Sequence, residues 1–114
     1  MESPVTHFEV YGRNAAALRE FYSAAFGWTI HYDEAMKYGL VHREEGDRGI
    51  GGGIGEGDPR VNFVIEVEDL EAKLAEIEQL GGKTVTPITV IPDVVTFAEF
   101  SDPEGNVIGI SKSE

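Results

Sequence analysis

The chain has 114 residues, 41% of them hydrophobic, and its 21 acidic and 9 basic side chains give a net charge of −12. The length predicts one domain, and the absence of cysteine excludes disulfides and thiolate metal sites. No apolar run approaches the roughly 20 residues that span a bilayer. The acidic balance argues against nucleic-acid and membrane partners, and the N-terminus, neither basic nor apolar, predicts a cytoplasmic protein without a secretory signal.

The first predicted strand covers residues 5–11 and has two different faces. Phe8 and Val10 alternate with a polar set, His7, Glu9 and Tyr11, so the two sets point to opposite sides of a sheet. A helix with an apolar stripe should follow, with an Asn as its N-cap at residue 14 and a Gly as its stop at residue 27. Three short strands are then expected, over residues 28–33, 38–42 and 49–54, before a turn-rich link over residues 55–59.

The second half repeats this order at an offset of 55 residues. A strand over residues 61–67 turns Phe63 and Ile65 to one face and Asn62 and Glu66 to the other. A helix capped by Asp69 follows, and strands are expected over residues 84–90, 94–100 and 107–111. The prediction is an α+β fold of two βαβββ modules, about residues 1–57 and 58–114. Their strands should form a curved mixed sheet, a trough with the helices on its outer face.

Five motifs occur in a fixed order along the chain. They are His7-Phe8-Glu9-Val10, Phe21-Tyr22, Phe26-Gly27-Trp28, Gly51-Gly52-Gly53 and Asp102-Pro103-Glu104-Gly105-Asn106. Together they resemble the vicinal-oxygen-chelate superfamily, which includes glyoxalase I, extradiol dioxygenases, fosfomycin-modifying enzymes and bleomycin-resistance proteins. The resemblance covers essentially the whole chain and implies the glyoxalase-like fold.

The resemblance also implies four positions for metal ligands, one on the first and one on the last strand of each module. They fall on His7, Asn62, a residue of the glycine run that we assign to Gly52, and Gly109. Only His7 offers a strong donor, whereas a divalent metal needs three or four. We therefore expect no metal and no other cofactor, and hence no Lewis-acid chemistry of the family type.

The polar residues of the two first strands are expected to converge on the trough as a small-molecule site. The predicted site contains His7, Glu9, Tyr11, Asn62 and Glu66, with Gly52 and Gly109 on its floor. His7 and Glu9 are also the candidate general bases. His31 and His42 are interpreted as solvated strand histidines, with His42 as an alternative second metal ligand.

A set of acidic residues is expected to cluster at one end of the first module. It comprises Glu44, Glu45, Asp47, Glu56 and Asp58. A solvated face is one interpretation. The other is the rim of a cation-attracting pocket, as in the bleomycin-resistance proteins, which the chain resembles in lacking a metal. Those proteins are dimers, so the resemblance also implies a homodimer.

Three hypotheses follow for function. The leading one is a metal-free binding protein that holds a small, partly aromatic or cationic molecule. The second is a lyase or dioxygenase with a non-standard metal site built from His7, Glu9 or His42. The third is a metal-free isomerase or epimerase that uses His7 or Glu9 as its base. Whether the chain is an enzyme stays open, although the donor count favours a binder.

Overall fold

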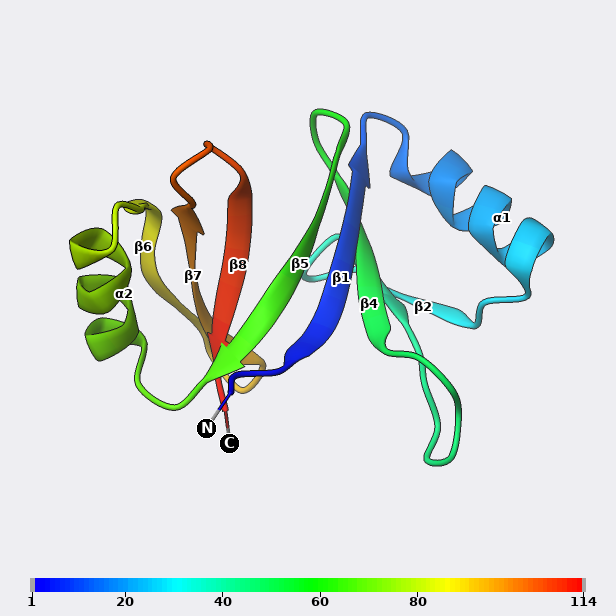
Figure 1. Ribbon diagram of the computed structural model, residues 1–114. Helices are drawn as coiled ribbons and strands as arrows, with labels where there is room; N and C mark the ends of the chain where they lie inside the picture. Colours follow the sequence, from blue (N-terminus) through cyan, green and yellow to red (C-terminus); the bar gives the residue numbers. More distant parts are fainter. Residues whose placement is uncertain (1, 114) are drawn as a thin grey trace. The chain divides into compact units, whose positions relative to one another are not determined.

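The computed structural model describes residues 2–113, which form two compact units (Figure 1). The N-terminal unit is His7–Asn62, and the C-terminal unit starts at Phe63 and includes the few residues before His7. Within the described residues the elements follow the order βαβββ twice, which confirms the predicted α+β fold of two such modules. No helix in this part of the chain is both long enough and apolar enough to cross a membrane.

The N-terminal unit consists of one helix and the four strands of its sheet. These are β1 (Val5–Gly12), α1 (Ala15–Phe26), β2 (Ile30–Asp33), β3 (Tyr38–Val41) and β4 (Gly51–Glu56). Its strand order is β2-β3-β4-β1, with β1 parallel to β4 and the other neighbours antiparallel. The predicted link therefore begins later than expected, because β4 continues to Glu56.

Helix α1 starts and stops where the sequence indicates. The side chain of Asn14 accepts a hydrogen bond from the N–H of Ala17 at 3.0 Å, and Gly27 ends the helix in the left-handed conformation with φ 71°. The helix covers one face of the sheet, where a buried cluster packs with Phe8 and Val10 from β1 and with Leu18 and Tyr22 from α1. This confirms the alternation predicted for β1. The buried cluster comprises Ala15, Val41 and Ile54.

The C-terminal unit repeats the arrangement with a longer third strand. Its elements are β5 (Arg60–Val67), α2 (Leu70–Gln79), β6 (Lys83–Ile91), β7 (Val95–Ser101) and β8 (Val107–Lys112). The strand order is β5-β8-β7-β6, and β5 is parallel to β8 as β1 is to β4. The buried core under α2 comprises Val67, Leu70, Leu74, Ala98 and Ile110.

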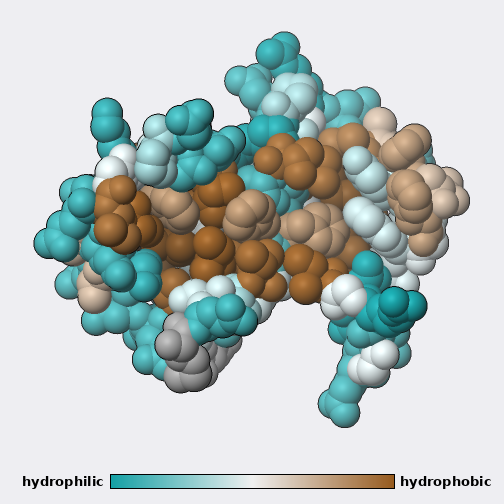
Figure 2. Space-filling view, in the orientation of Figure 1, coloured by the Kyte–Doolittle hydropathy of each residue, from teal (hydrophilic) through white to brown (hydrophobic). Residues whose placement is uncertain are grey.

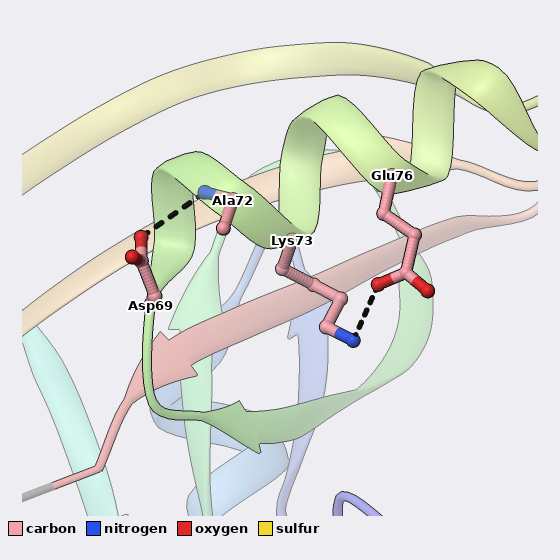
Figure 3. Close-up of polar contacts among 4 residues, drawn as sticks. All are labelled: Asp69, Ala72, Lys73 and Glu76. Atoms are coloured by element: carbon pink, nitrogen blue, oxygen red, sulfur yellow. Dashed lines mark hydrogen bonds and ion pairs between the residues drawn. The ribbon is translucent and has the colours of Figure 1, made fainter.

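Helix α2 is held by the cap that its sequence predicts. Asp69 accepts from the N–H of Ala72 at 3.0 Å, and one turn later Lys73 forms an exposed ion pair with Glu76 at 2.8 Å (Figure 3). The turn between β7 and β8 is held by Asp102, whose Oδ1 accepts from the N–H groups of Glu104 and Asn106. In the C-terminal unit, the start of α2 and the turn between β7 and β8 are therefore both held by hydrogen bonds to a local aspartate side chain.

Candidate functional site

The polar face of β1 carries a hydrogen-bonded cluster centred on Glu9. Its Oε2 accepts from the Tyr38 hydroxyl at 2.8 Å and from the Tyr11 hydroxyl at 2.9 Å. The Tyr38 oxygen is also 3.0 Å from Nε2 of His7, and the two rings are nearly parallel with centroids 6.3 Å apart. We call His7, Glu9, Tyr11 and Tyr38 the Glu9 network. All four residues are half-buried, so the network can be reached from solvent.

Glycines of β4 make room for the two tyrosines. In the β1–β4 register Gly53 lies beside Glu9 and Gly55 beside Tyr11. A Cβ on Gly53 would lie 1.8 Å from the Tyr38 Oη, and a Cβ on Gly55 would lie 2.4 Å from Cε1 of Tyr11. Any larger residue at either position would collide with the network. The space beside Gly53 and Gly55 is therefore not empty, because the rings of Tyr38 and Tyr11 occupy it.

Gly52 lies on the opposite side of the sheet from the Glu9 network, which differs from the predicted placement. A Cβ there would lie 2.4 Å from Cε2 of Phe8, which packs in the core under α1. Alternation along β4 explains the difference, because Gly52 shares its face with the buried Ile54. Gly53 is the glycine that faces the network.

Burial fixes the protonation of the network. Burial raises the pKa of the Tyr38 hydroxyl well above its usual range, and the charge and hydrogen bond of Glu9 raise it further. The Tyr11 hydroxyl shows the same direction of pKa shift for the same causes. Burial lowers the pKa of His7 below its ordinary value of 6.5, and Glu9 opposes that shift only in part. At neutral pH the network therefore contains two tyrosine hydroxyls and a neutral imidazole.

The hydrogen bonds also select the tautomer of His7. Tyr38 has a single hydroxyl proton, which it donates to Glu9. Its oxygen must then accept from Nε2 of His7, so the proton of the neutral ring lies on Nε2 and the lone pair on Nδ1. Chemically the network thus offers one carboxylate and one imidazole nitrogen that can accept a proton or a hydrogen bond.

Arg60 and Asn62 bring further polar groups to the N-terminal unit. The Arg60 guanidinium lies 4.9 Å from the centroid of the Tyr11 ring, and it lowers the pKa of the Tyr11 hydroxyl against the larger effects of burial and Glu9. Asn62, predicted as a site residue, is 5% exposed, and neither atom of its amide has a partner among the described residues. Its neighbour Phe63, predicted to point toward the helix, is 40% exposed. A buried amide without a partner is costly, which makes Asn62 a candidate ligand contact.

Glu66 and Gly109 belong to the C-terminal unit. Glu66 lines a hollow of about 630 Å³ between the β6–β7 connection and the ends of β5 and β8. Its other walls combine aliphatic residues of the β6–β7 region with polar and charged residues from that region and from the end of β8. They comprise Val90, Ile91, Asp93, Val94, Val95, Thr96, Ser111, Lys112 and Ser113. Gly109 lies beside Val64, whose Cγ2 would be 3.1 Å from an added Cβ.

The other two histidines lie together outside the Glu9 network. The rings of His31 and His42 meet edge to face at 5.9 Å, both residues are exposed, and Nε2 of His42 is 3.9 Å from Glu44. This agrees with their interpretation as solvated strand histidines. The structure does not bring His42 into a donor set with His7 and Glu9.

The acidic residues do not gather at one end of the unit, so that prediction is wrong. Glu44, Glu45 and Asp47 precede β4 in a hydrophilic loop that projects from the unit (Figures 1 and 2), whereas Glu56 is the last residue of that strand and Asp58 follows it. The five strand residues before Glu56 separate the two groups by about 17 Å. Asp58 is moreover paired with Arg13 at 3.1 Å. These carboxylates form no common rim.

The residues present do not fit a family-type metal centre. Among the described residues, no three His, Asp or Glu side chains lie close enough together to hold a metal ion. His7 directs Nε2 to Tyr38, and the tyrosine hydroxyl fills the space of a side chain at residue 53. Two donors on one strand are too few for a divalent first-row metal.

Sequence reasoning brought His7, Glu9 and Tyr11 together but did not assign Tyr38 or Arg60 to the site. Tyr38 is on β3, two strands away in the sheet from β1, and reaches Glu9 only across the glycines of β4. A tyrosine on a strand that is followed by a glycine run is the signal that could have suggested this. Arg60 carried no comparable signal in the sequence.

Comparison with known proteins agrees with this architecture. The profile of the glyoxalase-like domain matches residues 8–111, whereas no curated protein matches the sequence. Similar solved structures include a glyoxalase/bleomycin resistance protein/dioxygenase superfamily member from Vibrio splendidus 12B01, with a TM-score of 0.68, 14% identity, and 98% and 100% of the two chains covered. A hypothetical protein from Bacillus halodurans C-125 has a TM-score of 0.73 at 11% identity, with 100% of this chain and 96% of that chain covered.

A third similar structure is a methylmalonyl-CoA epimerase variant from Streptomyces coelicolor in complex with 2-nitronate-propionyl-CoA. Its TM-score is 0.68 at 14% identity, and the alignment covers 99% of each chain. Identities this low establish the fold alone. The family profile, however, spans nearly the whole chain and all ten helices and strands of the described part but for the ends of β1 and β8. The protein therefore belongs to the glyoxalase-like domain family.

Proposed function

We propose that this protein binds a small organic molecule at the Glu9 network and does so without a metal ion. The observation that supports the proposal is the half-buried Glu9 carboxylate, which two tyrosine hydroxyls hold in place. Polar groups fixed in advance on a face that solvent can reach are typical of ligand sites. The core of the unit, built on Ile54 and Val41, does not need them.

The donor count favours this proposal over a metal-dependent enzyme. The network provides His7 and Glu9 but no third donor among the described residues. Similar structures of this fold do hold small molecules, as the epimerase complex with 2-nitronate-propionyl-CoA shows for that protein. We therefore place the binding function at the network and derive it from organic functional groups alone.

A metal-free isomerase or epimerase is the second candidate. The neutral imidazole of His7 supports it, because Nδ1 can take a proton from a bound substrate. Turnover that is lost in His7→Ala and unaffected by chelators would favour this candidate. Ligand binding without turnover would leave the binding protein.

The test is a screen of a fragment library against the ¹⁵N-labelled full chain by NMR. We expect hits that shift the amide signals of Glu9, Tyr38 and Gly53 and that bind more weakly to Tyr38→Ala. Glu20→Gln is the matched surface control, because Glu20 is exposed on α1. Hits that shift only residues around the hollow beside Glu66 would contradict the proposed site.

The expected homodimer is part of this proposal but not a requirement of the site. All four residues of the network come from one chain. Light scattering after gel filtration would give the mass in solution. A monomer would remove the dimer from the proposal and leave the site intact.

A further inference from the structure

Hydrogen-bond accounting indicates what kind of ligand the Glu9 network can accept. Tyr38 and Tyr11 each donate their single hydroxyl proton to Oε2 of Glu9. Nε2 of His7 donates the ring proton to the oxygen of Tyr38. Every polar hydrogen that belongs to the side chains of the network is therefore directed inward.

The groups that remain are acceptors. No hydrogen bond from a described residue reaches Oε1 of Glu9 or Nδ1 of His7. The two residues are two positions apart on β1, so their side chains leave the same face of the strand. A carboxylate oxygen and an imidazole lone pair thus lie near one another, and the network has no hydrogen of its own to give to a ligand.

Charge points the same way. The chain carries a net charge of −12, which raises the local concentration of cations and lowers that of anions. The positive charge of Arg60 lies at the Tyr11 end of the network, 4.9 Å from the centroid of the Tyr11 ring. At the His7 end the described partners are the neutral Tyr38 and the carboxylate of Glu9. A ligand cation therefore fits the His7 end of the network.

We propose that the ligand is a protonated primary or secondary amine whose N–H groups donate to Glu9 and His7. This inference rests on the proposed function and names its ligand class. An ammonium group satisfies both acceptors and the charge at once, and charge-assisted hydrogen bonds of this kind are the stronger ones. The flat faces of His7 and Tyr38 provide an apolar flank for the carbon skeleton beside the amine.

Four probes of one shape separate hydrogen bonding from charge. Benzylammonium has charge and N–H groups, benzyltrimethylammonium has charge only, benzyl alcohol has a donor without charge, and benzoate has the opposite charge. Each is titrated near neutral pH into the ¹⁵N-labelled full chain, and the amide signals of Glu9, Tyr38 and Gly53 give the Kd. We expect benzylammonium to bind at least about tenfold more tightly than the other three.

Variants then test the assignment to Glu9. Glu9→Gln keeps an oxygen acceptor for the tyrosines but removes the charge, and it should weaken benzylammonium binding about tenfold or more. Glu20→Gln removes the same charge from the exposed side of α1 and should leave the Kd unchanged. The comparison among the four probes on the unaltered protein does not depend on how either variant folds.

Each outcome decides the inference. Equal affinities for the two cations would overturn the requirement for N–H groups, and preferential binding of the alcohol or benzoate would overturn the amine altogether. Either result would leave the proposed function standing, because a small molecule would still bind the network. Failure of all four probes would overturn the inference alone if other library fragments bind the network, and both proposals if none does.

Discussion

The N-terminal and C-terminal units are alike on the side that faces the helix. In each, a backbone N–H of the first helical turn donates to the capping side chain at 3.0 Å, Ala17 to Asn14 in one and Ala72 to Asp69 in the other. In each, an isoleucine of the last strand is fully buried, Ile54 at 0% and Ile110 at 1% exposed. Since the two sequences share few identities, it is the pattern of burial and capping that is repeated.

The units differ on the other side of their strands. In the N-terminal unit, glycines of β4 admit Tyr38 and Tyr11, whose hydroxyls converge on Glu9. In the C-terminal unit, the glycine that corresponds is Gly109, and Val64 occupies the space beside it. The hollow there has both aliphatic and polar walls. The repeated helix-facing side therefore supports the fold in both units, whereas the Glu9 network belongs to the N-terminal unit.

Truncation of the two buried isoleucines should have the largest effect. We expect Ile54→Ala and Ile110→Ala each to lower the free energy of unfolding by about 2–5 kcal/mol, because each leaves a cavity in a packed core. Urea denaturation followed by circular dichroism measures both. Val61→Ala is the control, since Val61 is 75% exposed and should cost under about 0.5 kcal/mol. A large loss in one unit and none in the other would contradict the equivalence of the two cores.

Replacement of Gly53 and of Gly109 by alanine should affect the stability of the two units differently. A Cβ on Gly53 displaces Tyr38, so Gly53→Ala should cost about 1–3 kcal/mol through lost hydrogen bonds to Glu9. In Gly109→Ala, Val64 need move only slightly, and reduced freedom of the unfolded chain offsets the strain, so the change should stay within about 1 kcal/mol. Urea denaturation again gives both values.

A double-mutant cycle with Tyr38→Ala identifies the origin of the Gly53 effect. If the collision with Tyr38 causes it, Gly53→Ala should cost little once that ring is gone. An unchanged cost in the Tyr38→Ala background would mean that the glycine is needed for another reason. The cycle thus tests the network by stability, independently of any ligand.

The order of elements, both helix caps and the two faces of β1 could be predicted because local side chains encode them. The face of each glycine on β4 could not, since Gly51-Gly52-Gly53 has no side chains whose alternation could mark the two sides of the strand. The role of Tyr38 depends on the pairing of β3 with β4, which the chain reaches only after a loop. Strand β4 also places Asp47 and Asp58, which are close in sequence, beyond its opposite ends.

The helix caps provide a smaller test of equivalence. We expect Asn14→Ala and Asp69→Ala each to cost about 1 kcal/mol, because each leaves one N–H of the first turn without its acceptor. Asn14→Asp and Asp69→Asn keep an acceptor and should cost much less. Lys73→Gln removes only an exposed ion pair and should change stability by under about 0.5 kcal/mol. If urea denaturation gives unequal losses of unfolding free energy for Asn14→Ala and Asp69→Ala, the two helices are anchored differently.

The pH dependence of stability should show the smallest effect, and only from the N-terminal unit. Burial lowers the pKa of His7 below 6.5 in the folded chain, so between that lowered value and 6.5 the unfolded chain binds more protons. The stability contributed by neutral His7 is therefore complete above about pH 6.5. It falls as the pH drops toward the folded pKa and levels off below it.

Replacement of His7 tests this slope directly. His7→Gln should flatten the decline of stability just below pH 6.5 relative to the unaltered protein, whereas the exposed His31→Gln should leave it unchanged. Urea midpoints measured at half-unit steps of pH give the comparison. Coincident curves for His7→Gln and the unaltered protein would mean that the imidazole is as well solvated in the folded chain as in the unfolded one. In that case burial would not hold His7 neutral, and the acceptor at Nδ1 would lose its basis.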